Sequence, residues 1–101
     1  MQDLARDALL NELQALQPSL ERRGVLHIAL FGSRARRDNR PDSDVDLIVD
    51  IDDNRPFSLL DLVGVTHEVE DRIGLPTNLF VRRSLEPSFA AEAAREQVPV
   101  F

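Results

Sequence analysis

The hydrophobic positions follow two periods, which divide the chain into alternating helices and strands. Between residues 3 and 20, apolar residues recur every three or four positions, which predicts an amphipathic helix. Pro18 lies inside this segment, so we expect the last turn of the helix to be disrupted. Residues 25–31 form a nearly unbroken apolar run between two glycines, which is typical of a strand buried on both faces.

The middle of the chain shows the period of a second strand. Residues 33–37 predict a short helical turn, and residues 38–43 have the composition of a loop. From Asp44 to Ile51, apolar residues alternate with mainly acidic ones, which predicts a strand.

Helical periodicity returns after residue 57. Ser58 and Asp61 have the spacing of a capping box, and an apolar stripe from Leu59 to Ile73 predicts a helix that ends at Gly74. We expect a third strand at residues 78–81, a last helix from a Ser84 cap through residue 94, and an apolar tail at residues 98–101. The order α-β-(short α)-β-α-β-α predicts an α+β fold in which helices pack on a small mixed sheet, in one domain spanning residues 1–101.

Composition and charge exclude several function classes. The chain has 101 residues and a formal net charge of −6, which argues against an electrostatic nucleic-acid binder. Its basic residues are all arginine and it has no cysteine, so lysine chemistry, thiol catalysis and cysteine-bound metals are excluded. No apolar run is long enough to cross a membrane, and residues 1–7 do not resemble a signal peptide, so we expect a cytoplasmic protein.

Two carboxylates in the second predicted strand are candidates for a metal site. Asp44 and Asp46 are two residues apart, so they point to the same side of a strand about 6.6 Å apart. A divalent cation would relieve their mutual repulsion, and carboxylate oxygens suit Mg²⁺ or Mn²⁺. Taken alone, an Asp-x-Asp pair at a strand end is more often a solvated surface feature.

A second candidate feature lies ten residues before the aspartates. Gly32 permits a tight turn, and the following helical turn offers N–H donors for an anion, together with the Ser33 hydroxyl. Taken alone, this segment is more often a plain strand–turn–helix junction capped by Ser33. Arginines between residues 34 and 40 match phosphate oxygens, although they can also form a solvated face. Anion donors beside a metal site are the minimum that holds a nucleoside triphosphate.

The combined pattern resembles a known family. Residues 30–36 (Leu-Phe-Gly-Ser-Arg-Ala-Arg) and 41–49 (Pro-Asp-Ser-Asp-Val-Asp-Leu-Ile-Val) are similar to the minimal nucleotidyltransferase (MNT) family of the DNA polymerase β-like nucleotidyltransferase superfamily. The signature of that family is Gly-Ser, ten residues, then Asp-x-Asp. The resemblance covers almost the whole chain, including residues 96–101.

The resemblance implies a role for each matching residue. Gly32 and Ser33 would bind the β- and γ-phosphates of ATP, Ser43 would steady the loop before the first aspartate, and Arg36 is a weaker candidate for phosphate contact. The Asp-x-Asp aspartates would be the catalytic pair and would hold two Mg²⁺ ions, or Mn²⁺, between the α-phosphate and the leaving pyrophosphate.

One position departs from the family pattern. The family usually places a third carboxylate on the next strand, and Asn78 stands at the corresponding position here. An amide oxygen can ligate a metal weakly, but it cannot accept a proton as a general base. We therefore expect Asn78 to weaken group transfer while nucleotide binding can survive.

Three functions follow from the resemblance. The first is an antitoxin-type nucleotidyltransferase that transfers AMP from MgATP to a tyrosine of a HEPN-domain ribonuclease toxin, within a hetero-oligomer. The second is an attenuated domain that neutralises the toxin by binding it. The third, a small-molecule nucleotidyltransferase of the aminoglycoside-modifying type, is disfavoured because 101 residues leave little room for an acceptor domain. We expect neither direct nucleic-acid binding nor a membrane.

Overall fold

The N-terminal helical segment is divided into two helices. The computed structural model describes residues 5–101, in which α1 spans Arg6–Gln14 and α2 spans Gln17–Arg22. Residues 3 and 4 of the predicted helix lie outside the described residues. The single helix predicted over residues 3–20 is wrong, because the helix is interrupted at residues 15–16. Pro18 lies in the first turn of α2, where its missing N–H needs no partner.

Four strands form one mixed sheet. They are β1 (Val25–Phe31), β2 (Val45–Ile51), β3 (Thr77–Val81) and β4 (Val98–Pro99), in the spatial order β3-β2-β1-β4. The strand β1 is antiparallel to both β2 and β4, whereas β2 and β3 run parallel. The predicted α+β class with a small mixed sheet is confirmed. The tail at residues 98–101, predicted only as apolar, supplies the edge strand β4.

The helix α4 (Leu59–Ile73) begins and ends as its sequence predicts. The Ser58 side chain accepts a hydrogen bond from the Asp61 backbone N–H, and the Asp61 carboxylate accepts one from the Ser58 N–H, which completes the capping box. The helix ends at Gly74, whose φ of 70° is left-handed. Leu59, expected on the buried stripe, is 74% exposed because the buried face begins later and runs through Val65, Val69 and Ile73.

The last helix starts later than its sequence suggests. Ser84 belongs to a 3₁₀ turn, η1 (Arg82–Ser84), and α5 spans Pro87–Glu96. The carboxylate of Glu86, rather than Ser84, caps α5 by accepting hydrogen bonds from the N–H groups of Ser88 and Phe89. A proline at the first helical position favours this start, since its ring presets the helical φ angle.

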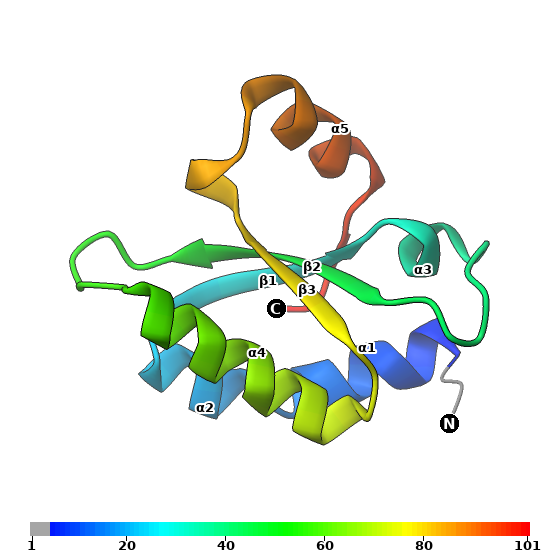
Figure 1. The fold of residues 1–101 in the computed structure, drawn as a ribbon, viewed down its shortest axis with the longest axis horizontal. Helices are drawn as coiled ribbons and strands as arrows, with labels where there is room; N and C mark the ends of the chain where they lie inside the picture. Colours follow the sequence, from blue (N-terminus) through cyan, green and yellow to red (C-terminus); the bar gives the residue numbers. More distant parts are fainter. Residues whose placement is uncertain (1–4) are drawn as a thin grey trace.

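The two faces of the sheet are covered unequally (Figure 1). The helices α1, α2 and α4 lie together on one face, where they enclose the main core with side chains such as Leu30, Leu47 and Val49, all 0% exposed. The short helix α5 lies on the opposite face, where a smaller cluster is built from Ala29, Phe31, Ile48 and Ala93. Within residues 5–101, no helix has both the length and the apolar character needed to cross a membrane.

Candidate active site

The face covered by α5 carries Asp46, the second aspartate of the motif, in a row of side chains across the sheet. Asp46 on β2 pairs in register with Phe31 on β1 and with Asn78 on β3. The next row on the same face contains Ile48 between Ala29 and Phe80. Because side chains two residues apart share a face, the polar row and the apolar row lie side by side.

Asn78 links the two aspartates of the motif. Its side-chain Nδ2 donates to Asp44 Oδ2 at 3.2 Å and to Asp46 Oδ1 at 3.0 Å. Asp44 and Asn78 are exposed and Asp46 is half-buried, so solvent screens part of the charge of the pair. The structure therefore brings the Asp-x-Asp pair together with the residue at the expected third-carboxylate position, although they are 32 and 34 residues apart in sequence.

Gly32 is required where β1 turns into the short helix α3 (Ser33–Arg36). Its φ is 75°, and a Cβ atom at this position would lie 2.5 Å from Asp46 Oδ2. Any side chain would collide with the carboxylate, so glycine allows the turn to approach the aspartates closely. Its carbonyl accepts hydrogen bonds from the N–H groups of Ala35 and Arg36, while Ser33 begins the helix.

A buried arginine holds the loop between α3 and β2. Arg34 is 2% exposed, and its guanidinium donates to the carbonyl oxygens of Pro41 and Ser43 at distances of 2.9–3.1 Å. The Ser43 hydroxyl in turn accepts a hydrogen bond from the Arg40 N–H at 2.9 Å. These contacts fix the backbone directly before Asp44. Sequence reasoning grouped Arg34 with its neighbouring arginines as candidates for phosphate contact or a solvated face, since no periodic signal separates it from them.

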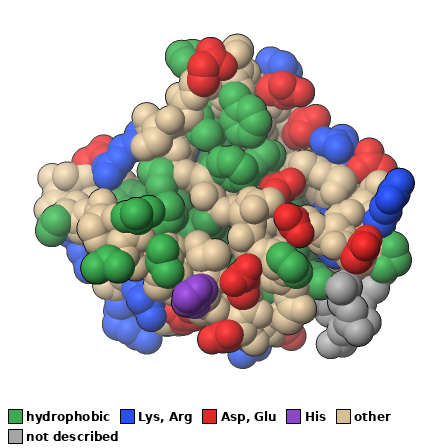
Figure 2. All heavy atoms as spheres, viewed as in Figure 1, with side chains coloured by type: hydrophobic (Ala, Val, Ile, Leu, Met, Phe, Trp, Pro, Cys, Tyr) green, Lys and Arg blue, Asp and Glu red, His purple; other side chains and the backbone are tan. Residues whose placement is uncertain are grey.

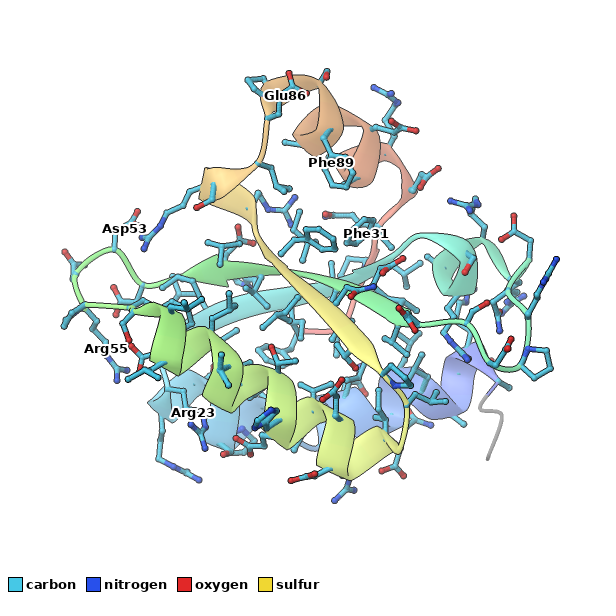
Figure 3. The ribbon with its side chains drawn as sticks, viewed as in Figure 1. Arg23, Phe31, Asp53, Arg55, Glu86 and Phe89 are labelled. Carbon is cyan, nitrogen blue, oxygen red and sulfur yellow. The ribbon has the colours of Figure 1, made fainter. Side chains whose placement is uncertain are left out.

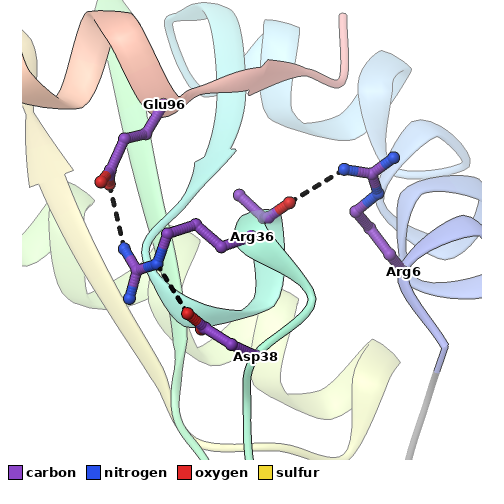
Figure 4. A network of polar contacts seen from close by, with 5 residues as sticks. Arg6, Arg36, Asp38 and Glu96 are labelled. Atoms are coloured by element: carbon purple, nitrogen blue, oxygen red, sulfur yellow. Dashed lines mark hydrogen bonds and ion pairs between the residues drawn. The ribbon is translucent and has the colours of Figure 1, made fainter.

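Arg36 is engaged by two carboxylates at the edge of the site (Figure 4). Its Nε donates to Asp38 Oδ2 at 3.0 Å, and its Nη1 donates to Glu96 Oε2 on α5 at 3.1 Å. The hydrogen bond to Asp38 raises the pKa of the Arg36 guanidinium above its ordinary value. Figure 4 also shows Arg6 of α1 donating to the Ala35 carbonyl, a bond of 2.8 Å that ties α3 to the N-terminal helix.

A pocket of about 340 Å³ opens beside Asp46, under α5. Three phenylalanines, Phe31, Phe80 and Phe89, form its apolar part, and their ring centroids lie 5.4–6.0 Å apart. Figure 3 shows Phe31 and Phe89 pointing toward one another from the sheet and from α5. The other lining residues are Gly32, Arg36, Asp46, Glu92, Ala93 and Glu96. Sequence reasoning missed this aromatic cluster, although strand alternation could have placed Phe80 on the same face as Asn78.

The donor atoms fit a divalent cation. Asp44 and Asp46 provide carboxylate oxygens, and one or two carboxylates plus substrate phosphates are the usual ligands of Mg²⁺ in proteins. The Asn78 amide presents its nitrogen to the carboxylates, so it has to turn over before its oxygen can face the same point. Among residues 5–101, no group of three or more histidine, aspartate or glutamate side chains is placed to hold a metal, in keeping with an amide at the third position.

The fold and the motif together define a nucleotidyltransferase, and comparison with known proteins agrees. The family model described as polymerase beta nucleotidyltransferase matches residues 14–101. The chain therefore belongs to this family, and it is of the minimal, single-sheet type.

Named relatives cover most of the chain. A Methanocaldococcus jannaschii protein named "Putative protein adenylyltransferase MJ0435" is 32% identical over 93 residues, which is 91% of this chain and 98% of the relative. Protein adenylyltransferase MntA of Thermococcus cleftensis is 38% identical over 80 residues, 79% of each chain.

Solved structures show the same fold. The structure described as a "putative minimal nucleotidyltransferase" superposes with a TM-score of 0.82 at 29% identity, covering 95% of this chain and 96% of the other. A toxin–antitoxin complex with AMP-PNP gives a TM-score of 0.73 at 16% identity, covering 90% and 73%. A tri-AMPylated Shewanella oneidensis HEPN toxin in complex with its MNT antitoxin gives 0.68 at 14% identity, covering 95% and 71%.

Proposed function

We propose that this nucleotidyltransferase transfers AMP from ATP, with Mg²⁺ or Mn²⁺, to a tyrosine of a partner HEPN-domain toxin, and so acts as an antitoxin. The observation that carries this proposal is the meeting of Asp44 and Asp46 with the Gly32 turn at one open edge of the sheet. The names of the relatives support protein adenylyl transfer. The complexes of similar fold, one with a HEPN toxin and one with AMP-PNP, support the partner and the nucleotide.

Each part of the site has a task in this proposal. Gly32 and Ser33, at the turn into α3, bind the β- and γ-phosphates, since the N–H groups that begin a helix have no partner within it. Arg36 reaches the phosphates by exchanging a carboxylate partner. Asp44 and Asp46 would hold the two metal ions, which would supply positive charge to the α-phosphate and the leaving pyrophosphate.

The proposed step conserves every atom. The tyrosine oxygen forms a bond to the α-phosphorus of ATP, and the bond from that phosphorus to the oxygen bridging the β-phosphate breaks. Pyrophosphate leaves, and the phenolic proton passes to solvent, because the Asn78 amide cannot accept it. Positioning and charge stabilisation therefore supply most of the catalysis, as in other phosphoryl transfers.

The experiment that tests this function is the intact mass of the partner. The chain is co-expressed with the protein of its neighbouring reading frame, and the partner is weighed by mass spectrometry. We expect the added mass of one or more AMP groups with the wild-type chain and none with Asp46→Ala. An unmodified partner beside the wild-type chain would contradict AMP transfer.

A second candidate function is neutralisation by binding alone, within a hetero-oligomer. It is favoured by the Asn78 amide, which bridges Asp44 and Asp46 where the family places a carboxylate. Under this alternative, the partner co-purifies unmodified and Asp44→Ala leaves neutralisation intact.

Replacing Asn78 by aspartate separates the two candidates. If the natural chain is an attenuated enzyme, Asn78→Asp raises the rate of AMP transfer at least tenfold, because it adds a base and a metal ligand. Asn78→Ala is the matched control, which removes the bridging hydrogen bonds without adding a carboxylate. Equal rates for the aspartate and alanine variants would show that the residue at position 78 does not limit transfer.

A further inference from the structure

The phenylalanines of the pocket beside Asp46 have no task in nucleotide binding as described above, although Gly32, Arg36 and Asp46 line the same pocket. Figure 2 shows hydrophobic side chains gathered between α5 and the sheet, with acidic side chains next to them. Phe89 is 40% exposed, although its ring lies 6.0 Å from Phe31 and 5.8 Å from Phe80. With a volume of about 340 Å³, the pocket falls within the range of small-ligand sites, about 300–1,000 Å³.

The aromatic wall begins directly at the reacting row. Phe31 is the register partner of Asp46, and Phe80 lies two residues beyond Asn78 on the same strand. Side chains at that spacing are about 6.6 Å apart. A ring held against this wall therefore lies immediately next to the Asp46 carboxylate.

The short distance between the aromatic wall and Asp46 suits the ring of a phenol better than a nucleobase. The hydroxyl of a tyrosine is bonded directly to its ring, so a ring stacked on Phe31 brings the hydroxyl to Asp46. A base is separated from its α-phosphate by a ribose, so a nucleotide whose α-phosphate lies at Asp46 carries its base farther away.

The charges of the lining favour an uncharged occupant. Asp46, Glu92 and Glu96 are acidic, and Arg36 is the basic residue among the lining side chains. Glu92 and Glu96 disfavour the polyphosphate beside α5, which leaves it the Gly32 turn, another part of the same lining. Edge-to-face aromatic packing, already present between Phe31 and both neighbours, suits the addition of another ring.

We propose that the pocket formed by Phe31, Phe80 and Phe89 receives the aromatic ring of the acceptor, so that the site selects a phenolic hydroxyl over a serine or threonine hydroxyl. This inference rests on the proposed AMP transfer and deepens it. The chemical step is unchanged: the phenolic oxygen bonds to the α-phosphorus, pyrophosphate leaves and the proton passes to solvent. The pocket holds the ring while that exchange occurs.

The first test measures binding and does not depend on transfer. Amide NMR spectra of the ¹⁵N-labelled chain with Mg²⁺ and AMP-PNP are followed while N-acetyltyrosinamide, N-acetylserinamide or adenosine is added. We expect only the tyrosine compound to shift the signals of Phe31, Phe80, Phe89 and Ala93. Shifts of these signals by adenosine, or by no compound, would overturn the proposal. A shift by the tyrosine compound supports it even if the wild-type chain proves unable to transfer AMP, so the two proposals fail separately.

The second test uses variants of Phe89, whose exposure makes a folding defect unexpected. Phe89→Ala should lower kcat/KM for a tyrosine acceptor about tenfold and leave the affinity for AMP-PNP within twofold. Phe89→Leu keeps an apolar contact but removes the ring. Its kcat/KM for the tyrosine acceptor should therefore lie between those of wild type and Phe89→Ala. Leu60→Ala, an exposed apolar residue of α4 outside the pocket, is the matched control. A loss of AMP-PNP affinity with acceptor kinetics unchanged would assign the pocket to the base and overturn the proposal.

Discussion

The two faces of the sheet differ in almost every physical property. The face toward α1, α2 and α4 carries aliphatic side chains from which solvent is excluded, among them Leu30, Leu47 and Val49. The face toward α5 carries Asp46, Asn78 and a half-open aromatic pocket. The comparison shows that burial is concentrated on one face, which leaves the other free to hold charged groups.

Charge on the second face depends on its openness. Two carboxylates beside one another are costly in a dry interior, but solvent and the Asn78 amide reduce that cost here. Covering this face with a full helical layer would demand a counter-ion for Asp44 and Asp46. The short helix α5 covers the apolar row and leaves the aspartate row accessible.

The largest expected effect is on AMP transfer. Asp46→Asn removes a carboxylate from the site and should lower the transfer rate about 10³-fold, about 4 kcal/mol in activation free energy. Its effect on stability should be small, because the side chain is half-buried and one negative charge of the pair is lost. Radiolabelled AMP incorporation and urea unfolding of the same sample check both expectations. Transfer at the wild-type rate would remove Asp46 from the catalytic site.

Substitution of the next residue, Leu47, should have the opposite effect, a loss of stability without a loss of transfer. Leu47 follows Asp46 on β2 but faces the main core and is 0% exposed. Leu47→Ala should lower the free energy of unfolding by about 3 kcal/mol through lost burial and a cavity. The transfer rate of the folded fraction should change little. If both neighbouring substitutions affected stability equally, the proposed division between the faces would be wrong.

Substitutions of two glycines, Gly32 and Gly74, test whether the turn at Gly32 must approach Asp46 closely. Gly32→Ala should destabilise the fold by about 1–3 kcal/mol, because it combines positive φ with a Cβ placed 2.5 Å from Asp46 Oδ2. Gly74→Ala is the control, since its φ is also positive (70°) but no atom lies within 4 Å of the added Cβ. Thermal unfolding should rank Gly32→Ala as the more harmful change, and AMP-PNP affinity should fall only for that variant. Equal effects would mean that backbone strain alone explains both.

The smallest expected effect belongs to the capping box on the core side. Hydrogen bonds from Ser58, first from its backbone N–H, lower the pKa of the Asp61 carboxyl below its ordinary value. Because the folded-state pKa is the lower one, this contribution to stability is fully present above about pH 4 to 5 and is lost as pH falls through the folded pKa. The difference in unfolding free energy between wild type and Asp61→Asn should therefore shrink on acidification. A pH-independent difference would assign the effect to packing.

Local sequence predicted most elements of this protein but not all of their limits. Periodicity located β1, β2 and α4, and the Ser58 capping box was confirmed in atomic contacts. The predicted start of α5 was wrong, since the Glu86 carboxylate and Pro87 together determine where the helix begins more strongly than Ser84 does. The edge strand β4 carried no periodic signal, because two residues are too few to show one.

Some features of the candidate site could likewise be predicted from the sequence, and others could not. The Gly-Ser and Asp-x-Asp spacing was evident along the chain, and so was the amide at position 78. The burial of Arg34, the Arg36–Glu96 contact and the meeting of Phe31 with Phe89 were not evident. Each of these involves a partner on another element or a loop carbonyl, for which local patterns carry no information.

The amino-acid sequence alone therefore determined most of the elements, the family and the motif residues proposed to hold a nucleotide and its metal, since these depend on residue type and short-range spacing. Tertiary structure decided which groups meet. It placed Asn78 against both aspartates and folded α5 over the sheet to form the aromatic pocket. The reason is that strand register and helix docking arise from burial summed over the whole chain, and only the folded molecule shows their result.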